Sequence, residues 1–107
     1  MLFKRKKKTY DEVVNQDLSK IKSLYVTTEM LIHLSTDDNT KLRLEKVGDI
    51  IRYLPPTQKA ESLKIESKLE AKLDDLKIAL STKKDQNKIQ TLLLEVELLV
   101  IERKNIW

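Results

Sequence analysis

The sequence predicts an all-α fold, a four-helix antiparallel bundle preceded by a flexible basic N-terminal arm. The apolar residues are mostly Leu and Ile, and the chain has one Gly, two Pro and no Cys, a composition that suits helices better than strands. These apolar residues recur every three or four positions in four segments separated by short polar turns. Because Pro55 and Pro56 are adjacent, two helical hairpins hinged at this point are the alternative arrangement.

The first helix is predicted over residues 10–34. Thr9 and Glu12 have the spacing of a capping box, in which each side chain bonds a backbone amide of the first turn. One apolar stripe follows, made of Val14, Leu18, Ile21, Tyr25, Thr28 and Ile32. Residues 35–40 are all polar and predict a turn.

The second helix is short, over residues 40–53, and ends before the prolines because the residue preceding a proline is disfavoured in helical geometry. Its stripe is Leu44, Val47, Ile51 and Leu54. Gly48 invites comparison with a helix-turn-helix motif, but the prolines would then lie inside the recognition helix, which excludes it. Gly48 is better explained by a close contact between helices.

The last two helices are predicted over residues 58–81 and 84–104, with Thr82 and Asp85 as a second capping box. The apolar seam of the third helix is Ile65, Leu69, Leu73, Leu76 and Leu80. The stripe of the fourth helix is Ile89, Leu92, Leu93, Val96, Leu99 and Val100.

The chain of 107 residues has the size of one domain, so we expect a disordered arm over residues 1–8 and a single helical domain over residues 9–107. The whole chain has 21 basic and 17 acidic side chains, a formal net charge of +4. One unbroken run accounts for all of this excess: Lys4, Arg5, Lys6, Lys7 and Lys8. The basicity therefore belongs to the arm and not to the helical body.

Such an arm could bind a polyanion, either nucleic acid or an anionic membrane surface, or could serve only as a solubilising tail. No apolar segment follows it, so it does not have the pattern of a signal peptide, and no apolar run is long enough to cross a membrane. We expect a cytoplasmic protein, with a peripheral position at the inner face of the membrane as the alternative.

Helix 58–81 carries two rows of like charge beside its seam. Lys64, Lys68 and Lys72 form one row, and Glu66, Glu70 and Asp74 form the other. Like charges four residues apart repel one another, so complementary helices are expected on both sides. A solvated flank of a bundle helix and a partner chain across the seam are the two interpretations.

The fourth helix has a second apolar seam opposite its main stripe, formed by Leu94, Leu98 and Ile101. This seam either packs under the long first helix or forms an interface with a protein partner or a second copy of the chain. Trp107 at the C-terminus fits the same interface, although a terminal Trp can also cap the core.

The residues offer little for catalysis. There is no Cys, and His33 is the one His in the sequence, so no metal site, cofactor site or small-molecule substrate is expected. We therefore predict a non-enzymatic helical interaction module that binds a protein partner or itself through its third and fourth helices, with the arm as a polyanion tether. The alternative is a nucleic-acid-binding accessory protein of a plasmid, phage or chromosome that uses the arm.

Overall fold

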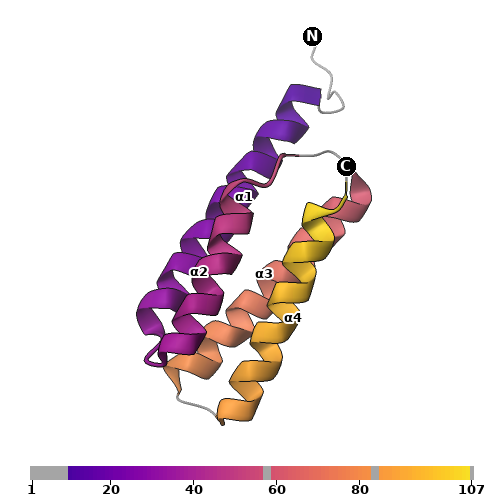
Figure 1. Cartoon of the computed structure of the whole chain (residues 1–107). Helices are drawn as coiled ribbons and strands as arrows, with labels where there is room; N and C mark the ends of the chain where they lie inside the picture. The colour runs from indigo at the N-terminus through magenta and orange to yellow at the C-terminus, as the bar shows by residue number, and fades with distance from the viewer. Residues whose placement is uncertain (1–9, 57–58, 83–84, 107) are drawn as a thin grey trace.

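A computed structural model describes residues 10–56, 59–82 and 85–106. Within these ranges the chain forms four α-helices and no strand: α1 (Tyr10–Leu34), α2 (Asp38–Arg52), α3 (Ala60–Ser81) and α4 (Gln86–Lys104). Figure 1 shows the four helices side by side along a common long direction. The all-α prediction is confirmed.

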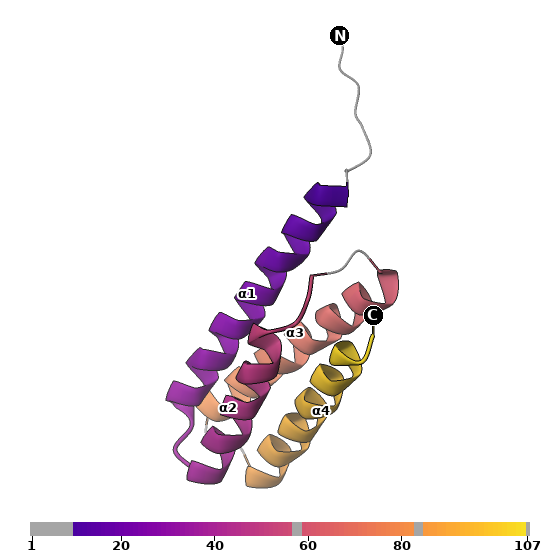
Figure 2. The same cartoon turned by 45° about the horizontal axis from the view of Figure 1, so that its top comes forward.

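The helices form two antiparallel hairpins, α1 with α2 and α3 with α4, and the hairpins pack on each other through α1 with α3 and α2 with α4. The helices α1 and α4 therefore lie on one diagonal of the bundle, and α2 and α3 lie on the other. Figures 1 and 2 show that α1 and α3 run in the same direction and that the N-terminal turns of α1 extend beyond the end of α2. The predicted four-helix bundle is confirmed, and the hairpins do not splay apart at the prolines.

The core is aliphatic and is built from the predicted stripes of α2, α3 and α4. The side chains with no exposed surface include Leu44, Ile51, Leu69, Leu73, Leu76, Leu93, Val96 and Val100. Burying such a side chain contributes roughly 1.5–3 kcal/mol, so packing of these faces, rather than helix propensity, holds the bundle together.

The inward face of α1 differs from the prediction. Leu18 is exposed at 37%, whereas the buried side chains are Asp17, Ile21, Leu24, Thr28, Leu31 and Ser35. Ile21 and Thr28 belong to the predicted stripe, whereas Asp17 and Ser35 are polar residues that a search for apolar spacing does not select. Thr28 and Ser35 satisfy their buried hydroxyl groups by donating to the carbonyl oxygens of Leu24 and Leu31, each at 2.8 Å.

The helix ends are fixed by side-chain caps. Asp37 is the N-cap of α2 and accepts from the Thr40 amide at 2.9 Å, and Asp85 is the N-cap of α4 and accepts from the Asn87 amide at 3.2 Å. The predicted capping box at Thr82 is wrong, because Thr82 is the C-cap of α3 and its hydroxyl donates back to the Ile78 carbonyl. Thr9 lies outside the described residues.

Gly48 lies at the contact between α2 and α1, as the sequence suggested. It is buried, and a methyl group in its place would come to 3.6 Å from the Thr28 methyl carbon and 3.8 Å from the Tyr25 ring. These are ordinary van der Waals distances, so the contact between the two helices does not require glycine at this position.

The charge rows of α3 form ion pairs with neighbouring helices of the same chain. Glu70 pairs with Lys20 of α1 at 3.3 Å, and Lys72 pairs with Glu95 of α4 at 3.2 Å. Glu66 departs from its row and is fully buried. One residue of each row thus has its counterion on a neighbouring helix of the bundle. Among the described residues, no helix is long and apolar enough to cross a membrane.

Candidate interaction surface

The second apolar seam of α4 faces outward. Leu94, Leu98 and Ile101 are exposed at 51%, 59% and 47%. The helix α4 packs on α2 and α3 but not on α1, so the alternative in which α1 covers this seam is excluded. These three side chains form an apolar ridge along one side of the bundle.

A groove runs along each side of the ridge. The groove toward α2 is walled by apolar side chains of both helices, Val47, Ile50, Leu94, Leu98 and Ile101, with Arg43 and Lys46 at its edge. The groove toward α3 is lined by Lys68, Ala71, Lys72, Glu95, Leu98 and Leu99. Leu98 lines both grooves and is therefore the centre of the surface.

Two of the cations in these grooves are already neutralised within the chain. Arg43 binds Glu97 with two hydrogen bonds, Nε to Oε2 at 3.0 Å and Nη2 to Oε1 at 2.5 Å, and its Nη1 donates to Gln90. The hydrogen bonds with Glu97 raise the pKa of Arg43 above its ordinary value. Lys72 has Glu95 as its partner. These ion pairs link α4 to α2 and to α3.

The other two cations of the grooves, Lys46 and Lys68, make no ion pair with any residue that the structure describes. They lie on opposite sides of the ridge, Lys46 on α2 and Lys68 on α3. We call the set Leu94, Leu98, Ile101, Lys46 and Lys68 the α4 surface.

A buried charge cluster, which the sequence did not predict, lies at the end of the bundle where α4 terminates. Arg103 is 1% exposed; its Nε donates to Glu66 Oε2 at 2.8 Å and its Nη2 to the Pro55 carbonyl at 2.6 Å. The same Nη2 lies 3.5 Å from Asp17 Oδ2. One side chain thus links α4 to α1, to α3 and to the loop after α2.

The cluster contains two carboxyl groups and one guanidinium. Burial, together with the neighbouring Asp17 carboxyl, raises the pKa of Glu66 to about 7, although its bond to Arg103 acts in the opposite direction. With a proton on one of the two carboxyl groups the cluster has no net charge. We interpret it as a structural clamp that carries a titratable proton.

A signal for this cluster exists in the sequence. Asp17, Glu66 and Arg103 each occupy an inward position that continues the apolar spacing of their helix. Charged residues at core positions on three helices, of opposite sign, predict a buried ion pair. Stripes defined by apolar residues alone omit all three.

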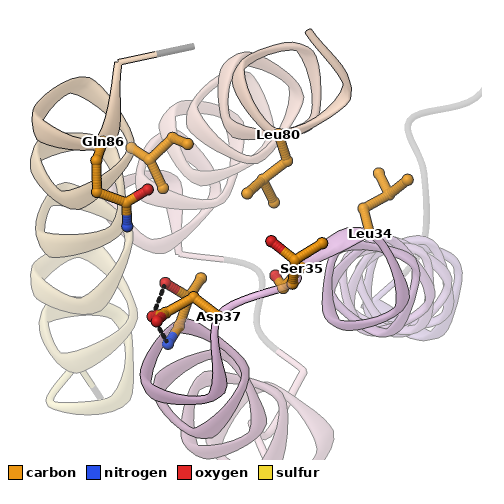
Figure 3. Close-up of a pocket in the computed structure, with 8 residues that line it drawn as sticks. Leu34, Ser35, Asp37, Leu80 and Gln86 are labelled. Atoms are coloured by element: carbon orange, nitrogen blue, oxygen red, sulfur yellow. Dashed lines mark hydrogen bonds between the residues drawn. The ribbon is translucent and has the colours of Figure 1, made fainter. Parts of the chain in front are cut away.

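A cavity lies at the opposite end of the bundle, between the turn that joins α1 to α2 and the ends of α3 and α4. Figure 3 shows Leu34, Ser35, Asp37, Leu80 and Gln86 around it. The Asp37 carboxylate is already occupied by the Thr40 amide at 2.9 Å and the Thr40 hydroxyl at 3.0 Å. Asp37 is therefore the capping residue of α2, and the cavity is a gap between the ends of the helices.

His33, the one His in the sequence, is exposed near the end of α1. In the described ranges, no group of three or more His, Asp or Glu side chains is arranged to hold a metal ion. The basic run Lys4 to Lys8 and Trp107 lie outside the described residues.

Comparisons with protein-family models, with curated proteins and with solved structures give no match for this chain.

Proposed function

We propose that this chain is a non-enzymatic helical interaction module that binds a protein partner or a second copy of itself through the α3 and α4 side of the bundle. The observation that carries the proposal is the exposure of Leu94, Leu98 and Ile101, at 51%, 59% and 47%, on one face of a helix that is otherwise packed. Contiguous exposed apolar side chains between grooves are typical of protein interfaces.

The strength of such an interface can be estimated from its apolar side chains. Full burial of an exposed Leu or Ile contributes roughly 1.5–3 kcal/mol, and these three are already about half buried, so completing their burial contributes about 2–4 kcal/mol. Binding also costs translational and rotational freedom. The ridge alone supports only a weak complex, and additional contacts from charges or from the arm are needed.

The arm over residues 1–8 supplies a further contact in this proposal, as a tether to a polyanion. On an anionic leaflet each basic residue contributes about 1 kcal/mol, which gives the arm an upper limit near 5 kcal/mol. Such a tether is reversible and does not select among partners. We place the protein in the cytoplasm, with the inner face of the membrane as one surface the arm could reach.

The test of this function uses Leu98→Glu, with Val26→Glu as its control. Val26 lies on α1, diagonal to α4, and is exposed at 59%, the same fraction as Leu98. We expect Leu98→Glu to abolish self-association in sedimentation equilibrium, or to abolish specific cross-linking to a partner in cells, while Val26→Glu keeps it. Wild-type behaviour of Leu98→Glu in both measurements contradicts the proposal.

The second candidate function is nucleic-acid binding by the arm, and the run Lys4 to Lys8 is the feature that favours it. Five neutralised phosphates would give a slope near −4.5 in a plot of log binding constant against log salt concentration on duplex DNA. Gel retardation of DNA and RNA with and without residues 1–8 tests it, and flotation with anionic liposomes tests the membrane alternative. Identical behaviour of the two proteins excludes the arm as the binding element.

A further inference from the structure

We infer that the occupant of the α4 surface is an amphipathic helix with acidic residues along both of its flanks, and not a second copy of this chain. The inference rests on the proposed function and names the chemistry of the partner. Three features carry it: the shape of the grooves, the two lysines beside the ridge, and the symmetry that a dimer would impose.

The shape of the surface suits a helix. Leu94 to Ile101 spans two turns of α4, about 10 Å along its axis, and the flanking groove toward α2 has apolar walls from Val47, Ile50, Leu98 and Ile101. A helix laid along this groove can place apolar side chains at positions i, i+4 and i+7 against the ridge, which is the usual geometry of helix-in-groove recognition.

The charge of the surface favours an acidic partner. Lys46 and Lys68 lie on the two sides of the ridge without an ion pair from the described chain, whereas the carboxylates in the same grooves, Glu95 and Glu97, are already bound to Lys72 and Arg43. A helix whose apolar stripe is flanked by Asp or Glu would place carboxylates beside both free lysines. Complementary charges of this kind determine the choice of partner and the rate of association more than the affinity.

A second copy of the chain does not present a uniformly acidic surface to Lys46 and Lys68. A two-fold dimer with α4 facing α4 brings either α2 against α2 and α3 against α3, or α2 against α3. In each case Lys46 and Lys68 approach flanks of the other copy that carry the same two lysines, where like charges disfavour the contact. The exposed carboxylates of these flanks, Glu45 and Asp49 on α2 and Glu102 on α4, lie beside Lys46 or Lys104, so a second copy offers mixed charge where an acidic helix offers carboxylates on both sides.

The test compares two labelled peptides of about three heptads, identical except at the flanks. Both carry Leu along one face; one has Glu at every flanking position and the other has Lys. Fluorescence anisotropy with the full chain should show the Glu peptide binding at least about tenfold more tightly than the Lys peptide. The Lys46→Glu, Lys68→Glu double variant should reverse this preference.

A matched double variant, Lys22→Glu with Lys77→Glu, controls for net charge. Both lysines are exposed, Lys22 on α1 and Lys77 on α3, and neither lines the two grooves beside α4. We expect this variant to keep the preference for the Glu peptide. An equal loss of preference in the two double variants would mean that overall charge, and not the α4 surface, selects the peptide, and would overturn the inference.

The remaining outcomes separate this inference from the proposed function. If neither peptide binds and wild type self-associates in a manner abolished by Leu98→Glu, the occupant is a second copy, and the inference fails while the proposed function stands. If neither peptide binds and Leu98→Glu behaves like wild type in self-association and cross-linking, both fail. Equal binding of the two peptides contradicts the inference of an acidic partner and leaves the proposed function standing.

Discussion

The Arg103 side chain makes the most demanding contacts in the molecule. It is buried together with Glu66 and Asp17 and also binds the Pro55 carbonyl. Desolvating three ionisable groups is costly, and the arrangement is stable only while all of them are present. The same contacts hold the loop after α2 against the end of α4, so the adjacent prolines are fixed in place.

Removing the Arg103 guanidinium from this cluster should therefore strongly destabilise the fold. We expect Arg103→Met to lower the free energy of unfolding by about 3–5 kcal/mol, because two buried carboxyl groups lose their counterion. The control is Arg43→Met, which breaks a partly exposed pair and should cost about 1 kcal/mol or less. Urea denaturation measures both, and equal losses for the two variants would contradict a clamp at Arg103.

The pKa of Glu66 makes stability depend on pH. Its pKa of about 7 in the folded chain lies above the ordinary value of 4.5, so the folded state holds a proton that the unfolded state releases. The contribution of this group is complete below pH 4.5 and is lost as pH rises through 7. Wild type should therefore lose up to a few kcal/mol of stability from this group between about pH 5 and pH 8.

The variant Glu66→Gln keeps a neutral side chain of the same shape and should lack this dependence. Because wild type loses stability as pH increases over that range and Glu66→Gln does not, the free energy of unfolding of the variant minus that of wild type should increase. The control Glu70→Gln removes an exposed carboxylate one turn further along α3 and should change stability by less than about 1 kcal/mol. If wild type and Glu66→Gln have parallel pH profiles, Glu66 does not carry the proton.

At the scale of single helices, Gly48 offers a direct test of the contact between α1 and α2. A methyl group fits there at 3.6 Å from its nearest neighbour, and alanine favours a helix by about 1 kcal/mol over glycine. We expect Gly48→Ala to raise the midpoint of thermal unfolding and Gly48→Leu to lower it. Destabilisation by alanine would mean that the helices pack more closely than the structure shows.

The sequence predicted the helices well where apolar spacing and packing coincide. Leu44, Val47 and Ile51 in α2, and Leu69, Leu73 and Leu76 in α3, lie in the core as expected. The prediction failed at the start of α1, where Asp17 is buried and Leu18 is exposed, although Ile21 and Thr28 lie inside as expected. A hydrophobic pattern cannot show that a carboxyl is inside when its counterion comes from a helix 86 residues away in the chain.

The same limit applies to the predicted surface residues of α4. A second apolar seam on α4 is visible in the sequence, but its exposure follows from the order of packing, which places α4 diagonal to α1. The spacing of residues within one helix does not determine which helices become neighbours. The free lysines beside the ridge belong to α2 and α3, so only the folded chain brings them to α4.

On the scale of the whole molecule, side-chain contacts join the two hairpins, and the outer side of α4 stays exposed. Arg103 joins three helices and a loop at one end, and the contacts of Arg43 with Glu97 and Gln90 join α2 to α4 along the other half. These links hold α4 against the rest of the bundle, and a surface that is ordered in advance would reduce the entropy lost by a proposed partner on binding.

The measurement that tests this claim most directly is a map of backbone amide chemical shifts in the ¹⁵N-labelled full chain, titrated with the peptide that carries Glu at its flanks. We predict that the shifted amides cluster around Leu94, Leu98 and Ile101 and on the facing turns of α2 and α3 that carry Lys46 and Lys68. Shifts concentrated on α1, or at the end of the bundle around Arg103, would contradict the account.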